Sequence, residues 1–502
     1  IYPNTAIGYS SMDSAIVNGA NTALGSFTLT SNKTGINNVA VGNAAMFEST
    51  AGSNNVAIGN DAGRLTSNGD NTAIGSGSLR NNTVGWGNTA TGTYSLNNQT
   101  TAIWNTANGY YALENDTTGS ENTAMGTSSF RHIRNAIRNV GVGINTGFWA
   151  SGSYNTYLGS YAGMGASGLN TGTLNTAVGY NVLRDISSGQ QNVAIGDNAL
   201  RYDSSGSRNI AIGSTSLERN LRGTDKVAVG YTAGRLDTAG LRSVYIGRDA
   251  GYNNQEDDII AIGYNALRNN SLGAAAGIAI QNVAIGASSL VQNSTGFSNT
   301  AIGTGALTQN ITGASNTAVG AYALSLSSAN GNSAFGHLAG NANTTGTNNT
   351  LIGYNADVTV NSLTNATAIG ANATVAQSNS LILGAGGTDV GIGTTTPTAN
   401  LDVNGDFALG VNGTVLTEVI KAAVTVDVVS IPANDVVIQT FTVTNATPGS
   451  SVMISPNGGL TNGLVLAYAR VSAANTVEVK FTNTTGAAIN PANMTYYITV
   501  IR

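Results

Sequence analysis

One short pattern of polar, apolar and glycine positions recurs along most of this chain. It reads Asn, then Thr or Val, then Ala-Ile-Gly, as at 55–59 and 71–75. The closing glycine, called here the marker glycine, occurs 22 times from Gly8 to Gly370. Of the 21 intervals, fifteen are 17 residues, four are 16, and the remaining two are 20 and 23. Self-similarity at a short fixed period is typical of a solenoid, in which one unit stacks on its own copies.

The residues before the marker glycine predict a strand. The preceding position is Ile, Val, Leu, Met or Phe in all but two of the 22 units, the one before it is almost always Ala, and the fourth position back is Asn in 18 units. Consecutive apolar residues are typical of a strand covered on both faces. We assign structural roles to these repeat positions: Asn55, Ala57, Ile58, Gly59, Asn71, Ile74, Gly75, Asn192, Ile195, Gly196, Asn299, Ile302 and Gly303.

A second apolar pair follows the marker glycine and predicts a second short strand. Examples are Ala112-Leu113 and Ala199-Leu200, and a minority of units have Ala-Gly instead, as at Ala62-Gly63. Each unit is therefore predicted as strand, tight turn, strand and loop. Because neighbouring strands lie about 4.8 Å apart, 22 such coils predict a rod on the order of 100 Å long.

The marker glycine and the asparagine each have a backbone explanation. A turn between short strands needs a positive φ or close backbone approach, and glycine permits both. Asparagine four residues earlier tolerates the same left-handed corner, and its amide can bond the asparagine of the next coil to form a ladder. The alternative is that asparagine is simply a common turn residue.

The apolar positions also predict self-association. With alanine on one face the interior of a coil is thin, and the Ile and Val row on the other face forms a long apolar stripe. Such a stripe normally marks an interface. Several identical chains packed around one axis would cover it, and we expect three. The alternative is a monomeric solenoid with a thicker core of its own.

These repeats resemble those of a known family. Asn-Thr-Ala-Ile-Gly followed by x-x-Ala-Leu, over roughly residues 4 to 384, is similar to the head repeats of trimeric autotransporter adhesins and to repeats in bacteriophage fibre proteins. The resemblance implies an all-β fold with a left-handed parallel β-roll of about 22 coils in a threefold bundle. The 17-residue period is longer than that of adhesin heads, which implies longer outer loops. No heptad stalk or outer-membrane anchor follows.

The chain changes character after the repeats. Residues 390–405 resemble a connector common in phage tail-fibre proteins. From residue 414 onward, six or seven β-rich runs separated by turn residues predict a small antiparallel β-sandwich, which resembles C-terminal domains of phage fibres. We therefore predict a solenoid shaft at 1–384, a neck at 385–413, and a sandwich at 414–502 that serves as a tip or a trimerisation domain.

Composition excludes several classes of function. Charged residues make up 9% of the chain, against roughly 25% in average soluble proteins, and the net charge is −5. No basic run suggests a nucleic-acid partner. There is no cysteine, and no stretch approaches the 18 apolar residues of a membrane-spanning helix, so we expect no membrane insertion.

Candidate catalytic or ligand-binding residues are few. His132 and His337 lie in distant repeats and are interpreted as isolated surface histidines. Glu256-Asp257-Asp258, with Asp249 upstream, is interpreted as a solvated loop in preference to a cation or catalytic site. No helix is predicted after Gly141-Val-Gly143, so a phosphate cradle is rejected. We predict no enzyme activity, no metal and no cofactor.

Two groups of arginines and three tryptophans have alternative interpretations. The arginines could bind acidic glycans or serve as solubilising charges, and the tryptophans could stack on sugars or, as we prefer, pack between subunits. The arginine groups are Arg131, Arg134 and Arg138, then Arg201, Arg208, Arg219 and Arg222; the tryptophans are Trp86, Trp104 and Trp149.

The resemblance implies a trimeric phage tail fibre that presents a receptor-binding tip. Its partners would be itself, a host surface glycan or protein, and a virion baseplate or tail protein bound through residues expected upstream of Ile1. Its location would be the virion, outside the cell. The alternative is a bacterial cell-surface adhesin or filament subunit. A glycan-cleaving tailspike ranks third, and an ice-binding solenoid is weaker because threonines do not form a regular face.

Overall fold

The computed structural model describes residues 3–16, 19–166, 170–271, 278–405, 407–408 and 415–502. Two compact units are present, Ile1–Gly386 and Gly387–Arg502. Every regular element in the described ranges is a strand, and these ranges contain no helix. The all-β prediction is therefore confirmed.

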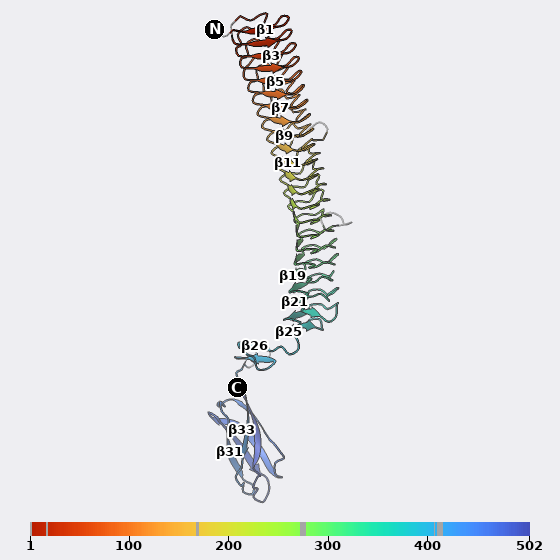
Figure 1. Ribbon diagram of the computed structural model, residues 1–502. Coiled ribbons are helices and arrows are strands. Elements are labelled where there is room, and N and C mark those ends of the chain that lie inside the picture. The colour runs from red at the N-terminus through yellow and green to blue at the C-terminus, as the bar shows by residue number, and fades with distance from the viewer. Residues whose placement is uncertain (1–2, 17–18, 167–169, 272–277, 406, 409–414) are drawn as a thin grey trace. The chain divides into compact units, whose positions relative to one another are not determined.

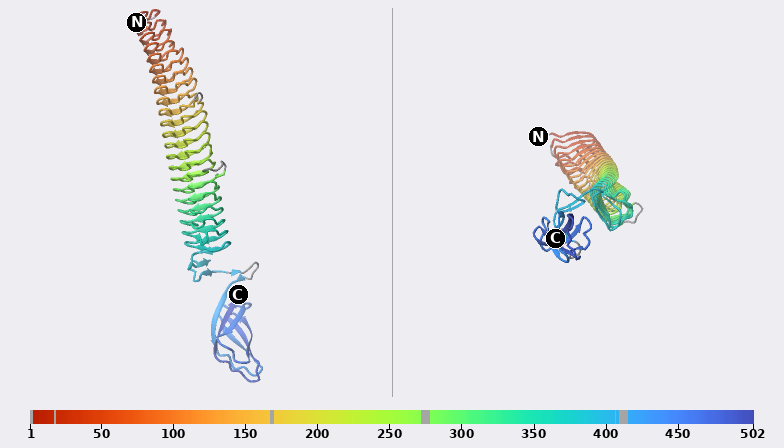
Figure 2. Two further views of the ribbon diagram at one scale, coloured as in Figure 1. Left: turned by 90° about the vertical axis from the view of Figure 1, so that its right-hand side faces the viewer. Right: turned by 90° about the horizontal axis from the view of Figure 1, so that it is seen from below.

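The first unit is a parallel β-solenoid built on one sheet of 23 three-residue strands (Figure 1). In Figure 2 its coils lie one above another along the unit. The strands of this sheet are β1 (Thr5–Ile7), β2 (Thr22–Leu24), β3 (Val39–Val41), β4 (Val56–Ile58), β5 (Thr72–Ile74), β6 (Thr89–Thr91), β7 (Thr106–Asn108), β8 (Thr123–Met125), β9 (Val140–Val142), β10 (Thr156–Leu158), β11 (Thr176–Val178), β12 (Val193–Ile195), β13 (Ile210–Ile212), β14 (Val227–Val229), β15 (Val244–Ile246), β16 (Ile260–Ile262), β17 (Val283–Ile285), β18 (Thr300–Ile302), β19 (Thr317–Val319), β20 (Ser333–Phe335), β21 (Thr350–Ile352), β23 (Thr367–Ile369) and β25 (Leu381–Leu383).

Equivalent residues of successive units stand directly opposite one another. Ala57 pairs with Ala73, for example. The two longer intervals keep this register, because Thr156 pairs with Thr176 across 20 residues and β16 pairs with β17 across 23. The solenoid prediction with its 17-residue period is confirmed. β25 adds a strand beyond the last marker glycine.

The marker glycines need both properties that the sequence suggested. All 22 have φ between 124° and 142°. A Cβ atom on Gly59 would lie 2.7 Å from the carbonyl carbon and oxygen of Gly75 in the next coil. Each corner therefore combines a backbone conformation open mainly to glycine with close contact between coils.

The predicted asparagine ladder is present, although its backbone differs from the prediction. The Asn55 backbone N–H and Nδ2 both donate to Asn38 Oδ1, at 2.9 and 3.1 Å, and Asn55 Oδ1 accepts from the Asn71 N–H at 2.9 Å. The predicted left-handed corner at this asparagine is wrong, because the preceding Asn54 takes it, with φ of 58°. Asn55 instead continues the strand ladder, since its carbonyl accepts from the Val39 N–H at 2.8 Å.

The predicted second strand is wrong for most coils. The Ala-Leu segment forms turns, and Leu113 and Leu200 have φ of 52° and 49°. Successive residues of an extended strand point to opposite sides, whereas the side chains of Ala112 and Leu113 are both buried. The left-handed leucine lets both enter the same core. The paired strands β22 (Asp357–Val358) and β24 (Thr374–Val375) do form a second sheet.

The interior is thicker than the alanines alone indicated, because most coils add a buried leucine or another bulky side chain to it. Where a bulky residue replaces the strand alanine, glycine replaces the leucine. Tyr157 stands in β10, and a Cβ on Gly163 would lie 2.4 Å from its ring. Tyr245 in β15 likewise contacts Gly234 and Gly251, where a Cβ would lie 2.5 and 2.2 Å away. The single chain thus closes its own core at nearly constant volume.

A second row of buried polar side chains runs inside the solenoid, and it was not predicted from the sequence. Its members lie seven residues after the marker glycine and three before another glycine. Asn82 Oδ1, for example, accepts from the Gly85 N–H at 2.9 Å. Asp116 and Asp203 occupy the same place and accept from Gly119 and Gly206. The repeated spacing Asn/Asp-x-x-Gly was the available signal.

The second unit is an antiparallel sandwich preceded by two short strand pairs. Parallel strands β26 (Val390–Ile392) and β27 (Leu401–Val403) pair, as do antiparallel β28 (Phe407–Ala408) and β29 (Val415–Leu416). Residues 406 and 409–413 of the predicted neck, and residue 414 at the start of the predicted sandwich, lie outside the described residues. The remaining strands form sheets ordered β30-β35-β32 and β31-β34-β33: β30 (Val419–Val426), β31 (Val436–Thr442), β32 (Ser451–Pro456), β33 (Leu464–Ala473), β34 (Thr476–Asn483) and β35 (Met494–Ile501).

The two sheets of this unit share one core. The Tyr496 ring of β35 lies edge-on against Phe441 of β31 and Phe481 of β34, with centroids 5.2 and 5.7 Å apart. All three side chains are buried. The predicted antiparallel fold of the C-terminal region is therefore confirmed.

We expect Asn55→Ala to loosen the coils on both sides of it. The change leaves the buried N–H of Asn71 without its acceptor, whereas Asn71 Nδ2 keeps its bonds to the carbonyls of Gly69 and Gly85. One orphaned buried donor costs about 1–3 kcal/mol. Hydrogen exchange of the amides in β4 and β5 should accelerate accordingly. The control Asn60→Ala removes an exposed asparagine and should leave exchange unchanged. Equal protection in both variants would contradict a stabilising ladder.

Gly59→Ala should be more disruptive than the ladder substitution. The new Cβ meets the Gly75 carbonyl and forces φ away from 135°, a penalty of about 3 kcal/mol or more. Limited proteolysis should then cleave near this coil. Gly386→Ala is the control, because its Cβ meets no atom within 4 Å. Proteolytic resistance equal to that of the control would show that the corner tolerates a side chain.

Candidate functional site

The most extensive candidate site is the outward face of the 23-stranded sheet. We define this outward face as the residues one and three positions before each marker glycine, together with the end residues of β25. The predicted repeat residues divide between its two sides. The strand alanines, such as Ala57, are buried, while Ile58, Ile74, Ile195 and Ile302 are 37–39% exposed. The isoleucine position of the repeat therefore faces away from the core.

The outward face carries no charge over its described strands. Its row directly before the marker glycines is apolar in all but two members, and about half of the other row is threonine. The residues of this face are Thr, Val, Ile, Leu, Met and Phe, with single Ser and Asn members, and it includes no Asp, Glu, Lys or Arg. Because the strands are in register, these side chains form two continuous rows along the unit. Contiguous exposed apolar patches of this extent mark interaction surfaces in proteins.

Several charges elsewhere on the solenoid are paired between neighbouring coils. Arg131 Nε lies 2.6 Å from Glu114 Oε2, and Arg138 Nε lies 2.9 Å from Glu121 Oε2. Arg208 is likewise 2.6 Å from Asp225 Oδ1. The two arginine groups are therefore partly neutralised along the stack, and Arg208 does not add an unpaired charge to the suggested basic patch.

One shallow hollow lies within the second arginine group. Its volume is about 350 Å³, and Tyr202, Arg219, Leu221 and Thr238 line it. The guanidinium of Arg201 lies 4.8 Å from the centre of the Tyr202 ring. An aromatic ring beside cationic groups suits the ring faces and acidic groups of a glycan. Arg222 is exposed nearby in sequence but does not line the hollow.

Aromatic side chains contact one another from coil to coil. Trp86 and Trp104 meet edge to face, with ring centroids 5.0 Å apart. Trp149 stacks on His132 at 4.1 Å. These contacts lie within one chain and account for part of the packing that we assigned to subunit contacts. Trp104 remains 51% exposed.

The two histidines are not isolated. His132 stacks on Trp149, and burial lowers its pKa together with the charge of Arg131. His337 stacks on Tyr354 at 5.6 Å. Both imidazoles therefore take part in rows of rings, and Asn115 Nδ2 lies 3.2 Å from His132 Nδ1.

The acidic segment is only partly a solvated loop. Asp258 Oδ1 lies 2.7 Å from Arg242 Nε, and Asp257 Oδ1 accepts from the Leu241 N–H at 2.8 Å. Glu256, by contrast, is buried, which corrects the interpretation of the whole segment as solvated. Asp249 bonds the Thr232 hydroxyl in the preceding coil. These four acids therefore have different surroundings and form no common site.

Two acids with raised pKa values lie inside the solenoid. Burial raises the pKa of Asp203 to about 7 and that of Asp116 well above its usual range. Both side chains are fully buried and bond glycine N–H groups. A general acid must reach its substrate, whereas these carboxyls close inner turns.

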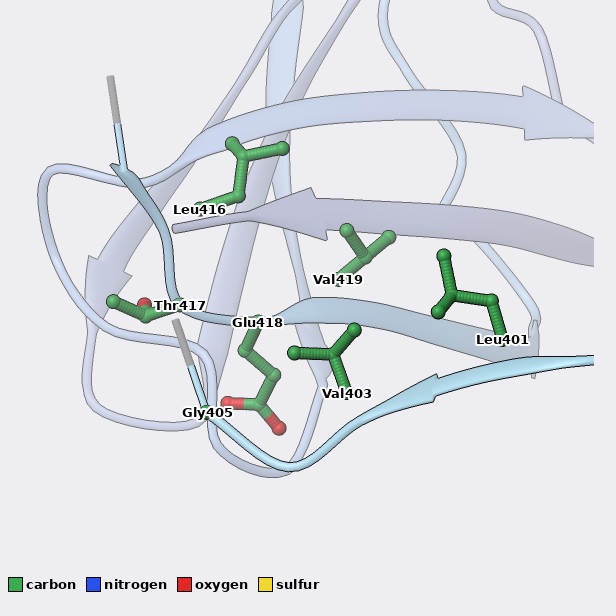
Figure 3. Close-up of a pocket in the computed structure, with 7 residues that line it drawn as sticks. All are labelled: Leu401, Val403, Gly405, Leu416, Thr417, Glu418 and Val419. Carbon is green, nitrogen blue, oxygen red and sulfur yellow. The ribbon is translucent and has the colours of Figure 1, made fainter. Parts of the chain in front are cut away.

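In the second unit, a pocket of about 390 Å³ lies beside the short strands. Leu401 and Val403 of β27 face Leu416 and Val419 across it, with Thr417, Gly405 and Glu418 completing the wall (Figure 3). Glu418 Oε2 lies 3.1 Å from Arg502 Nε. The pocket is thus mostly apolar, with one paired charge.

The described residues contain no group of three or more His, Cys, Asp or Glu placed to hold a metal ion. Within the same ranges, no helix has the length and hydropathy needed to cross a membrane. Comparisons with known protein families, with curated proteins and with solved structures found no match to this chain.

The raised pKa of Asp203 predicts a pH dependence of stability. Between about pH 4, where the unfolded carboxyl ionises, and about pH 7, the folded state alone keeps the proton, so stability falls as pH rises. Asp203→Asn, which places the amide of other coils in this position, should abolish that loss. Thermal melting of the variant should exceed that of the parent at pH 8, and the difference should vanish near pH 4.

Asp197→Asn is the matched control, because it removes the same charge from an exposed position in the same coil. Its melting temperature should follow the parent at both pH values. A stabilisation of Asp203→Asn that is equal at pH 4 and pH 8 would contradict a buried, neutral Asp203.

Proposed function

We propose that this chain is a structural and adhesive fibre protein that works as a homotrimer, most specifically a bacteriophage tail fibre. The observation that carries the proposal is the outward face, whose two uncharged rows, one of them apolar almost throughout, repeat over 23 strands. In this proposal three solenoids cover these rows against one another. The number three and the phage assignment rest on the resemblance of the repeat to adhesin heads and phage fibres.

The architecture of the first unit suits a mechanical role. Successive coils are joined by strand hydrogen bonds, in most units also by the asparagine ladder, and in some by ion pairs such as Arg131–Glu114. At about 4.8 Å per strand, 23 strands extend roughly 110 Å. A stack of this kind resists bending because every coil contributes the same contacts.

The sandwich would then act as the tip that meets a host surface glycan or protein. Its strands leave several large side chains exposed, among them Met453, Val465 and Tyr497. Three copies held together would present these surfaces at high effective concentration, so that weak individual contacts give strong attachment. The virion would be bound at the other end of the fibre.

A bacterial surface adhesin remains the alternative, because it would use the same shaft and the same display. The two differ in what the other end attaches to, a tail baseplate or a cell envelope. Isolation of assembled particles and identification of this chain in their appendages would support the phage assignment, and its recovery from a cell envelope would reject it.

The proposed contact between outward faces can be tested with the double substitution Ile195→Asp and Ile212→Asp. Charges on adjacent strands of the outward face must be desolvated in an assembly, so we expect association to weaken by at least about 100-fold, or about 3 kcal/mol. Sedimentation velocity should show a trimer for the parent and a folded monomer for the variant.

The control is Ser188→Asp with Ser205→Asp, which adds two charges at exposed loop positions one coil apart. This pair should leave the sedimentation of the parent unchanged. A trimer that survives the isoleucine substitutions would move the subunit contact to another face.

A further inference from the structure

The asparagine ladder is interrupted in three successive coils. Lys226, Ser243 and Ile259 stand four residues before their marker glycines, where 18 other units have asparagine. The lysine keeps one ladder contact, because its backbone N–H donates to Asn209 Oδ1 at 3.1 Å. Its side chain, however, enters the core and is completely buried.

The amine at the end of this side chain lies against two acyl groups. Lys226 Nζ is 2.8 Å from Asp237 Oδ2 and donates to Asn220 Oδ1 at 3.0 Å. Both partners belong to the second buried polar row. Asp237, like Lys226, is completely buried, so water is excluded from the pair.

Further donors surround the Asp237 carboxyl. The Gly240 N–H donates to Oδ1 at 2.9 Å, and the Tyr245 hydroxyl donates to Oδ2 at 2.8 Å. Tyr245 is itself fully buried in β15 and is held by Asn254 Nδ2 at 2.5 Å. Asp203 is the next acid, bonded to Asn220 at 3.3 Å.

Burial favours the neutral amine at Lys226 and the neutral phenol at Tyr245. Burial is the main cause that lowers the pKa of Lys226, and it raises the pKa of Tyr245 well above its ordinary value, so that the phenol stays a donor. Transfer of one proton within the Lys–Asp pair gives an amine and a carboxylic acid. A desolvated, neutral lysine amine is a nucleophile, and fixed proximity replaces a bimolecular encounter.

We propose that Lys226 and Asp237 join in an intrachain isopeptide bond. The Nζ–Cγ bond forms, the Cγ–Oδ2 bond breaks, and Oδ2 leaves as water with the carboxylic proton and one proton from Nζ. No oxidant or other co-reactant is needed. The Gly240 N–H stabilises the negative charge that develops on Oδ1, and the Tyr245 hydroxyl assists the departing Oδ2.

The bond would clamp the coil where the ladder is weakest. It closes a short loop from residue 226 to 237 around the corner at Gly230, within a stretch that lacks three ladder asparagines. A covalent link opposes unfolding even when neighbouring coils open. This inference does not depend on the proposed fibre function, because it concerns only the interior of one chain.

Intact-mass measurement of the purified full chain tests the proposal. We expect a mass about 18 Da below that calculated from the sequence, the loss of one water. Trypsin should fail to cleave after Lys226, and the fragment 223–235 should be recovered joined to 236–242. A full calculated mass with free cleavage at Lys226 would overturn the proposal.

Two variants keep the result interpretable. Lys226→Asn restores the residue found in 18 other units, so it should fold, and its mass should equal the calculated value. Tyr245→Phe retains the ring but removes the donor to Oδ2, so the linked fraction should fall. A loss of about 17 Da in the parent, with the link at Asn220 and ammonia released, would overturn the assignment of Asp237.

Discussion

In-register stacking of short parallel strands is the constraint on which this structure depends. Because each unit repeats at nearly the same interval, every sequence position becomes a continuous row along the solenoid. A side chain at a repeated position must therefore fit the coil and also pack against the same side chain in the coils on either side. Asparagine meets this condition inside, since its amide both donates and accepts along the row. Glycine meets it at the corner, where successive backbones touch.

Departures from the repeat are compensated within the same or the adjacent coil. Tyr157 and Tyr245 enter where glycines have replaced leucines, so the core keeps its volume. Lys226 replaces a ladder asparagine and pairs with Asp237 of the second buried polar row. Surface arginines have acids one coil away. Over the described strands, the side chains of the outward face remain partly exposed, and the proposed trimer would cover them.

The features that depend on one repeated residue could be predicted from the sequence. Those that depend on contact between two different repeat positions could not. The period, the corner glycines and the asparagine ladder follow from single repeated residues. The second strand was wrong because consecutive Ala and Leu both face the core, which requires a left-handed leucine. The buried polar row that contains Asp203 was not predicted, although the repeated Asn/Asp-x-x-Gly spacing indicates it. The Lys226–Asp237 pair had no such signal, since their separation in sequence becomes contact only through the path of the coil.

The central functional claim is that the outward face is covered by sister chains. Met125 lies on this face in β8 and is 44% exposed in the single chain, whereas Met453 of the second unit is 60% exposed and Met46 is buried in the core. Oxidation of the native assembly by peroxide, followed residue by residue by mass spectrometry, compares them directly. The account predicts that Met453 is oxidised readily while Met125 is protected to nearly the level of Met46. Oxidation of Met125 at a rate close to that of Met453 would contradict it.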